Sequence, residues 1–291
     1  MKGSIYLSLA ASIWGGMYVV SKAVLAVISP MELLWLRYVV ALVALGLMGL
    51  ITKQSWRIQR QHMPLILSIG FIGYFVSILA QFVGTQLSSA QMGAVITSAT
   101  PTFMAIFAYF LLGESISFKK VISVGLATLG VLLIVGVGDL GDSFQLGGAI
   151  LFIAALTWAL MSVLVKKVPP EYSQIVVTTY AMLIATVIMT PFIIPSFTIA
   201  NFRVLAEPAI WGGVLYIGIV STAGAFYLWN KGLQLMEASR GGLYFFFQPV
   251  VGTVLGWLLL GEEPDVFFWF GAVLIGSGVF LAVKENEKKD P

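Results

Sequence analysis

Two basic side chains, Lys22 and Arg37, fall inside long apolar stretches, where an ionisable group is costly without a partner or water. A helix that begins at Pro30 would place Arg37 roughly 10 Å inside it. The planar guanidinium of arginine can hold a carboxylate with two parallel hydrogen bonds. Glu32 is the nearest acid, but its spacing from Arg37 puts it about 140° around a helix axis. Arg37 is therefore predicted to bind an anionic group of a substrate, or to snorkel or form a structural ion pair.

Aromatic side chains accompany these charges at helical spacing. Trp14, Tyr18 and Lys22 recur every four residues, which places them on one face of a helix. Aromatic rings on a cavity wall offer apolar area, a hydrogen-bonding edge and a surface for cations. An interfacial belt is the alternative for a Trp or Tyr near a helix end, but Trp14 and Trp158 lie near the middle of their predicted spans. We predict that Trp14, Tyr18 and Trp158 contact substrate.

Further polar and aromatic side chains inside predicted spans complete the candidate substrate-binding set, which is Trp14, Tyr18, Arg37, Tyr74, Gln81, Ser98, Trp158, Tyr227, Tyr244 and Gln248.

Two prolines are predicted to act as hinges. Pro101 and Pro249 are expected in the middle of the fourth and ninth spans, where a missing N–H frees the carbonyl four residues earlier, at Thr97 and Phe245. A freed carbonyl needs a polar partner, and Thr97 and Gln248 stand close by. A simple packing kink is the alternative reading of each proline.

The elements that must position these residues follow from composition. The chain has 291 residues, a mean hydropathy of +0.98, 59% hydrophobic residues and 10% charged residues, whereas soluble domains carry about 25% charged residues. Continuous apolar runs of about 20 residues exclude the alternating pattern of a β-barrel. The predicted fold is an all-α integral membrane protein with ten transmembrane helices, at 4–27, 30–51, 64–84, 89–112, 119–136, 147–165, 173–195, 210–231, 240–260 and 266–283.

Basic residues set the predicted orientation. With both termini inside, the inner segments hold 13 of the 16 Lys and Arg residues, and cytoplasmic connections collect positive charge. The protein is therefore expected to be a multi-pass protein of the cytoplasmic (cell) membrane with both termini in the cytoplasm. The first span is too long for a signal-peptide core and is expected to stay uncleaved.

An internal repeat divides the chain. The block of Ala90, Pro101 and Gly113-Glu114 recurs 148 residues later as Ala238, Pro249 and Gly261-Glu262, while Trp14 matches Trp158 at a shift of 144. We predict two five-helix repeats, residues 1–142 and 143–291. Because five spans is an odd number, the second repeat is inverted in the membrane. Inverted repeats are typical of secondary transporters, whose substrate site lies between the repeats near mid-membrane.

These residues resemble a known family. Trp14-Gly15, Pro30 with Leu36-Arg37, and the twice-repeated Ala…Pro…Gly-Glu block are similar to the ten-helix drug/metabolite transporter superfamily, EamA-type branch. The resemblance covers the whole chain, although Trp158 is followed by Ala159 where the first half has Trp-Gly. It implies a cytoplasmic-membrane exporter of amino acids, metabolites or drugs, without implying one substrate.

The resulting hypothesis is a secondary transporter that exports small organic metabolites, such as amino acids or related amphipathic compounds, by alternating access. An integral-membrane enzyme acting on lipid-like substrates, or a non-transporting membrane assembly subunit, is the alternative. The chain has no cysteine and one histidine, and no catalytic motif, so we expect no enzyme, no metal and no cofactor. Expected partners are a small-molecule substrate and the lipid bilayer but no nucleic acid. Monomer and homodimer both stay open, as do coupling to an ion and facilitated diffusion.

Overall fold

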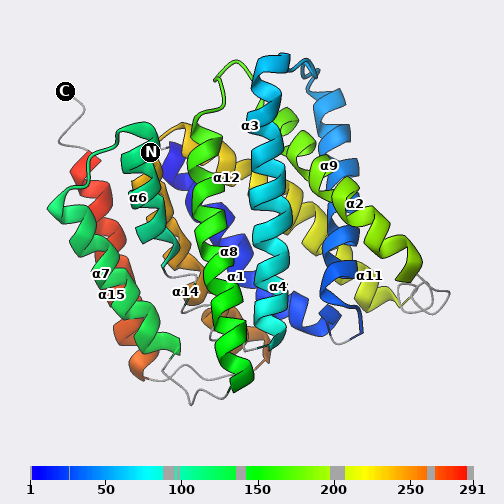
Figure 1. Cartoon of the computed structure of the whole chain (residues 1–291). Coiled ribbons are helices and arrows are strands. Elements are labelled where there is room, and N and C mark those ends of the chain that lie inside the picture. The colour runs from blue at the N-terminus through cyan, green and yellow to red at the C-terminus, as the bar shows by residue number, and fades with distance from the viewer. Residues whose placement is uncertain are drawn as a thin grey trace.

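A computed structural model describes residues 2–25, 27–87, 96, 99–135, 142–196, 207–260 and 266–286. All regular elements in these ranges are helices, packed side by side as a bundle (Figure 1). The first repeat contains α1 (Lys2–Leu25), α2 (Pro30–Ile51), η1 (Arg60–His62), α3 (Met63–Ser68), η2 (Ile69–Ser77), α4 (Ile78–Leu87), α6 (Thr100–Leu112) and α7 (Phe118–Val135). The second contains α8 (Asp142–Lys166), α9 (Gln174–Ile193), η3 (Ile194–Ser196), α11 (Pro208–Leu215), η4 (Tyr216–Gly224), α12 (Ala225–Gln234), α13 (Ala238–Gly241), η5 (Gly242–Phe246), α14 (Phe247–Leu260) and α15 (Val266–Asn286).

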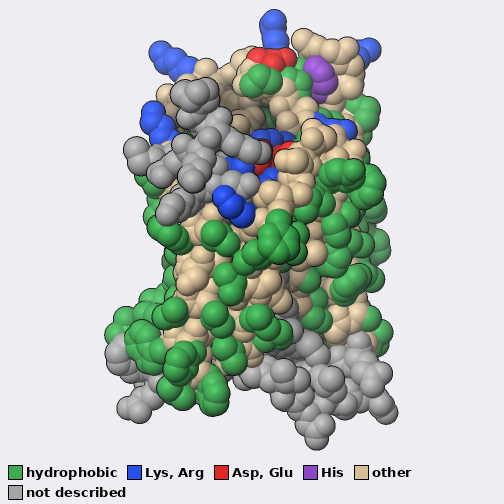
Figure 2. All heavy atoms as spheres, turned by 90° about the vertical axis from the view of Figure 1, so that its left-hand side faces the viewer, with side chains coloured by type: hydrophobic (Ala, Val, Ile, Leu, Met, Phe, Trp, Pro, Cys, Tyr) green, Lys and Arg blue, Asp and Glu red, His purple; other side chains and the backbone are tan. Residues whose placement is uncertain are grey.

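The surface and the helix lengths confirm a helical membrane protein. Five described stretches are long and apolar enough to cross a bilayer: Pro30–Ile51, Arg60–Gly84, Leu146–Lys166, Gln174–Ile193 and Pro208–Gln234. Figure 2 shows hydrophobic side chains over the flank of the bundle and Lys and Arg side chains gathered at its upper end. The start of α1 and the last turn of α15 lie at that same end (Figure 1). The count of ten spans stays a prediction.

The first turn of α2, the helix that carries Arg37, is stabilised by its local sequence. Ser29 caps the helix and Pro30 occupies its first turn, where the absent N–H breaks no helical bond. The Glu32 carboxylate accepts hydrogen bonds from Ser29 N (3.1 Å) and Ser29 Oγ (2.7 Å). This capping box stabilises the helix end. Glu32 is therefore engaged at the helix start, and no ion pair joins it to Arg37 among the described side chains.

Helices of the two repeats pack against each other. In the first repeat, α1 lies against α12 and α14, α2 against α9, α4 against α8, and α7 along α15. Figure 1 shows α7 beside α15 at one edge of the bundle and α2 near α9 at the other. Each of these contacts joins helices of different repeats, so the interface between the repeats is lined by both.

Glycine contacts repeat with the sequence. A Cβ added at Gly84 would lie 2.9 Å from the carbonyl oxygen of Gly147, and one added at Gly232 would lie 3.2 Å from that of Gly3. Gly84 and Gly232 match at the shift of 148, and Gly3 and Gly147 match at the shift of 144. The same close helix approach is thus built twice, once by α4 on α8 and once by α12 on α1.

A second glycine pair shows the same symmetry next to Arg37. A Cβ at Gly70 would lie 2.7 Å from the carbonyl oxygen of Ala181, and a Cβ at Gly218 would lie 3.1 Å from that of Arg37. Ala181 and Arg37 again match at the shift of 144. The backbone packing around Arg37 therefore has a full counterpart in the other half, whereas its charge has none.

Two π-helical stretches, η2 and η4, interrupt the third and eighth spans at equivalent places, and each has nine residues. No residue pattern in the sequence indicates these two stretches. A π-helix carries an extra residue per turn and is frequent at functional sites. Both stretches supply groups to the cavity region described below.

The prolines sit differently from the expectation. Pro101 is the second residue of α6 and Pro249 is the third of α14, so each begins an α-helix instead of interrupting its middle. Pro101 fits the first turn of α6 because its missing N–H would have no helical partner there. The carbonyl of Phe245, four residues before Pro249, belongs to the 3-10 stretch η5 that precedes α14. The corresponding carbonyl before Pro101, that of Thr97, lies outside the described residues. The hinge role stays a prediction.

Candidate functional site

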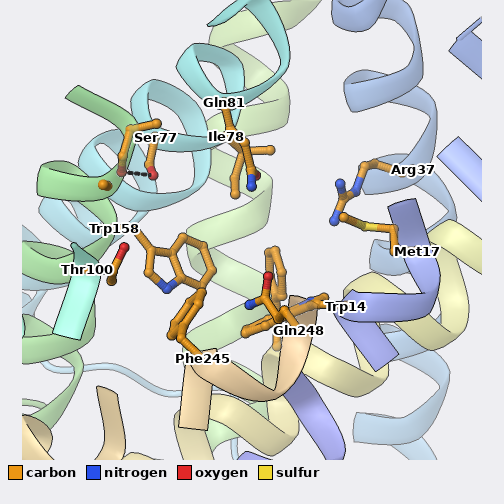
Figure 3. Close-up of a pocket in the computed structure, with 13 residues that line it drawn as sticks. Trp14, Met17, Arg37, Ser77, Ile78, Gln81, Thr100, Trp158, Phe245 and Gln248 are labelled. Carbon is orange, nitrogen blue, oxygen red and sulfur yellow. Dashed lines mark hydrogen bonds between the residues drawn. The ribbon is translucent and has the colours of Figure 1, made fainter. Parts of the chain in front are cut away.

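A partly open cavity lies between the two repeats, and about 480 Å³ of space in and around it, some of it open to solvent, is not filled by atoms. Seven of its lining residues belong to the first repeat and six to the second: Trp14, Met17, Arg37, Ser77, Ile78, Gln81 and Thr100, then Ala154, Ala155, Trp158, Phe226, Phe245 and Gln248. Figure 3 shows these side chains converging from several helices, with Arg37 and Trp158 on opposite sides. A mostly apolar cavity with few polar groups is typical of a small-molecule site.

Trp14 of α1 lies in an aromatic cluster and contacts several of its rings. Its ring centroid lies 5.5 Å from that of Trp158, 5.5 Å from Phe226 and 5.7 Å from Phe245. Its Nε1 donates a hydrogen bond to the Ser221 carbonyl in η4 (2.9 Å). Edge-on and tilted rings at these separations attract one another, and the hydrogen bond fixes the indole to the scaffold. Trp14 therefore presents a rigid apolar face.

Arg37 of α2 is the one charged residue among the described lining residues, and only 1% of it is exposed. Its Nε donates to Thr222 Oγ1 (2.7 Å), which in turn donates to the Ile217 carbonyl (2.7 Å). This arrangement holds the guanidinium by one nitrogen. In Figure 3 the guanidinium extends from α2 toward the interior of the cavity.

Three aromatic rings surround the Arg37 guanidinium. Its Cζ lies 5.8 Å from the ring centroid of Tyr38, 5.7 Å from Phe82 and 5.7 Å from Phe226. Cation–π contacts at these distances partly compensate for burial of the charge. The described residues give Arg37 no carboxylate partner, so within this part of the chain a hydroxyl and three rings are the groups that offset its charge.

The remaining polar lining comes from both repeats. Ser77, at the end of η2, donates from Oγ to the Ala154 carbonyl of α8 (2.8 Å), which joins the repeats beside the cavity. Gln248 of α14 lies next to α1 because Gly15 of α1 has no side chain. A Cβ on Gly15 would lie only 2.7 Å from the Gln248 carbonyl oxygen. Gln81 and Thr100 complete the polar set.

Trp158 differs from Trp14, the other indole of the lining. It is 7% exposed, and its ring packs against Trp14 and Phe226, with centroids 5.5 Å away in both cases. Its buried Nε1 has no hydrogen-bond acceptor among the described residues. A buried donor without an acceptor carries a desolvation cost.

The structure brings together half of the predicted contact residues: Trp14, Arg37, Gln81, Trp158 and Gln248 line one cavity. Tyr74, Tyr227 and Tyr244 do not line it. Ser98 and the side chain of Tyr18 lie outside the described residues.

Tyr74 stands one layer behind the cavity. Its ring centroid is 5.1 Å from that of Phe226, and its hydroxyl accepts from Asn230 Nδ2 (2.9 Å). Asn230 Nδ2 also donates to Thr178 Oγ1 (2.9 Å). Tyr74 therefore supports a lining ring through a buried network, and its hydroxyl is occupied by protein.

Sequence reasoning missed Ser77 and Phe226 as lining residues. Ser77 stands four residues before Gln81, which is a detectable spacing, but the π-helical stretch ends at Ser77 and alters the facing of that span. One Phe among many apolar residues gives no signal of its own.

A charged cluster also went unpredicted, at the end of the bundle where α1 begins. Lys120 and Arg240 are among the basic residues counted for the predicted inner segments, and both are only 3% exposed. Lys120 Nζ lies 3.0 Å and Arg240 Nε 2.7 Å from Glu237 Oε2. Lys120 Nζ also donates to Ser239 Oγ (2.7 Å). These contacts tie α7 of the first repeat to the α12–α13 connection of the second.

Glu114, from the repeated Gly-Glu block, completes this cluster. Its carboxylate accepts from Ala238 N (2.8 Å), Ser239 N (3.1 Å) and Ser239 Oγ (2.7 Å). Gly113 makes the preceding turn with a left-handed φ of 69°, which favours glycine. The end of α6 thereby caps the start of α13 in the other repeat.

Relatives of the chain are transporters by name. The EamA-like transporter family matches it twice, over residues 1–136 and 145–284. The putative permease-like protein YdzE of Bacillus subtilis (strain 168) is 65% identical over 75 residues, which are 26% of this chain and 96% of YdzE. The uncharacterized transporter YetK of the same organism is 29% identical over 98% of this chain and 88% of YetK.

Two further similarities are more distant. The S-adenosylmethionine/S-adenosylhomocysteine transporter of Chlamydia muridarum (strain MoPn / Nigg) is 26% identical over 92% of this chain and 88% of that protein. A solved crystal structure superposes over 99% of both chains with a TM-score of 0.80 at 19% identity, which shows a shared fold.

Proposed function

Because this chain belongs to the EamA-like transporter family, we propose that it is a secondary carrier that exports small amphipathic metabolites bearing a carboxylate, such as amino acids or related compounds. The carrier works by alternating access, with the cavity between the repeats as the substrate site. The protein is a membrane transporter by family; its substrate class and direction of transport are the proposal.

The buried Arg37 carries the argument for a carboxylate. A cation removed from water costs free energy that a nearby opposite charge offsets. The described protein supplies Arg37 with a hydroxyl and three rings but no acid. A substrate carboxylate can pair with the free edge of the guanidinium through two hydrogen bonds, an interaction strengthened by low local dielectric.

The aromatic cluster supports an apolar substrate body. Trp14, Phe226 and Phe245 present ring surface beside Arg37, and aromatic surface binds flat or aliphatic groups by burial. One end of the substrate is therefore anionic and its body apolar.

The enzyme alternative receives less support than the carrier. Arg37 alone is charged among the described lining residues, whereas acid–base catalysis needs a titratable group beside the reacting atoms. The named relatives are transporters. We propose that the chain has no catalytic activity.

Counterflow in proteoliposomes tests the proposal. Purified variants are reconstituted into proteoliposomes at matched protein levels. The vesicles are loaded with carboxylate solutes, including amino acids, or with their amide analogues. Arg37→Gln is expected to abolish counterflow of carboxylates nearly completely, and Arg37→Lys to weaken it because lysine lacks the bidentate fork. Lys167→Gln is the matched control, since Lys167 is an exposed cation away from the cavity. Normal carboxylate transport by Arg37→Gln, or equal transport of acids and amides, would make Arg37 a structural charge.

Orientation is part of the same proposal. We place both termini in the cytoplasm and divide the chain at residues 142 and 143, with the protein acting as monomer or homodimer. Reporter tags in the 52–63 loop and on the carboxyl tail are expected to read cytoplasmic, and a tag near Asp142 to read external. External labelling of the 52–63 loop would overturn the proposed orientation.

A further inference from the structure

Trp158 and Trp14 are repeat mates that have taken different hydrogen-bonding states. Trp14 Nε1 donates to the Ser221 carbonyl at 2.9 Å. Trp158 Nε1 is buried and has no acceptor among the described residues. The repeat fold could have given both indoles a scaffold partner, but among the described residues only Trp14 has one. The Trp158 N–H is therefore a buried, unsatisfied donor in a residue that lines the cavity.

The surroundings of the two indoles differ. At the shift of 148 the counterpart of Ser221 is Gly73, and at the shift of 144 the counterpart of Met17 is Met161. A Cβ on Gly73 would collide with Met161 Cγ, so Met161 packs directly onto Gly73. Met17 instead lines the cavity.

Trp158 and Arg37 lie within reach of one small molecule. Both pack against the Phe226 ring: Arg37 Cζ is 5.7 Å and the Trp158 ring centroid 5.5 Å from its centroid. Figure 3 shows the two side chains on opposite sides of the cavity, with the indole nitrogen on the Thr100 side of its ring. A molecule that spans Phe226 can meet the cation at one end and the indole N–H at the other.

We infer that Trp158 is a specificity-determining hydrogen-bond donor, and that the transported anion carries a neutral acceptor, a carbonyl or hydroxyl oxygen or a ring nitrogen, opposite its carboxylate. This inference rests on the proposed function, because the carboxylate end is assigned to Arg37. Trp158 donates to the acceptor, and Gln248 lies in the same lining with an amide that can donate or accept.

The physical basis is an asymmetric cost. A ligand that fills the cavity without an acceptor leaves the Trp158 N–H buried and unsatisfied, whereas one that supplies an acceptor removes that cost. The expected preference for an acceptor over an apolar group of the same shape is about fivefold to tenfold in Kd.

Two isosteric ligand pairs measure this preference. In levulinate and isocaproate the ketone oxygen of the first is replaced by a methyl group in the second, with a hydrogen added to the carbon that bore it. The pair para-acetylbenzoate and para-isopropylbenzoate differs in the same way. Binding of all four to the full-length protein in nanodiscs is measured by titration calorimetry. Wild type is expected to bind the ketone of at least one pair about fivefold to tenfold more tightly than its alkyl partner.

Trp158→Phe keeps the aromatic ring and removes the donor, so the ketone preference is expected to fall to about onefold. Trp35→Phe is the matched control, because Trp35 Nε1 donates to Thr190 Oγ1 (3.0 Å) and Trp35 does not line the cavity. It should keep the preference. A purely structural role of Trp158 would change both members of a pair equally and leave their ratio intact.

The outcomes separate this inference from the proposed function. Equal binding of ketone and alkyl acids by wild type, or an unchanged ratio in Trp158→Phe, overturns the role of Trp158 and leaves the carboxylate site standing. Failure of wild type to bind any of the four acids overturns the inference, and normal Arg37→Gln transport in the counterflow assay would independently overturn the carboxylate site.

Discussion

The two repeats build the same scaffold and equip it differently. Gly70 packs on Ala181 and Gly218 packs on the backbone of Arg37, so the helix contacts around these two positions correspond. The side chains do not, because a buried cation in the first repeat stands where the second has a methyl group. The symmetric packing is compatible with two similar conformations, one open to each side of the membrane. The asymmetric side chains give one end of the cavity a positive charge.

The largest expected effect tests the shared scaffold. Gly70→Ala and Gly218→Ala each force a Cβ against a neighbouring helix, at 2.7 Å from the Ala181 oxygen and 2.5 Å from Val40 Cγ1. We expect each to lower the free energy of unfolding by about 1–3 kcal/mol, measured by thermal unfolding in detergent.

Gly46→Ala is the control for both changes, since a Cβ there has nothing within 4 Å. It should be neutral or slightly stabilising because alanine favours helix. If one of Gly70→Ala and Gly218→Ala proves harmless, the packing symmetry of the two repeats is broken at that contact.

The next effect concerns the contact that joins the repeats at the α1 end of the bundle. Glu114→Ala removes the acceptor of three hydrogen bonds from Ala238 and Ser239, and is expected to lower the free energy of unfolding by about 1–3 kcal/mol. Glu171→Ala, at an exposed acid, should have no measurable effect. Equal melting temperatures for the two variants would show that Glu114 does not hold the repeats together.

A smaller effect separates the paired tryptophans. Trp14→Phe leaves the Ser221 carbonyl without its indole donor and should lower the free energy of unfolding by about 1 kcal/mol. Trp158→Phe removes no hydrogen bond within the described protein and should unfold near the wild-type temperature. Destabilisation of Trp158→Phe as large as that of Trp14→Phe would mean that Trp158 Nε1 has a structural partner.

The smallest effect is expected at the prolines. Pro249→Ala should change the transport rate a few-fold with little change in expression, because Pro249 follows the 3-10 stretch η5 and its replacement allows a further helical hydrogen bond. Pro101→Ala should change the rate less, since Pro101 occupies the first turn of α6. Initial counterflow rates at matched protein levels decide this, and equal rates in wild type and both variants would remove the hinge.

Much of the fold could be predicted because lipid imposes simple rules. Long apolar runs require helices that satisfy their own backbone, and the matched Pro and Gly-Glu blocks revealed the repeat. The repeat in turn indicated a cavity between the halves, and Trp14, Trp158 and Arg37 meet there. Their positions deep inside spans were informative because charges and indoles are unusual at that depth.

The rest depended on features without a sequence signature. A π-helical stretch changes which face of α4 meets the cavity, so helical spacing alone did not identify Ser77. Tyr74 has the composition of a contact residue, but Asn230 occupies its hydroxyl. Lys120 and Arg240 look like anchors by position and are buried because Glu237 lies between them.

The π-helical stretches also bear on how such a chain can change by insertion or deletion. A residue removed from η2 would convert its wide turn to an α-helical one and rotate α4 by about 100° relative to the preceding helix. Gln81 would then leave the cavity and Phe82 would leave the Arg37 guanidinium. Loss or gain of one residue in η2 or η4 is thus a minimal change that rotates all the side chains which the following helix presents to the cavity.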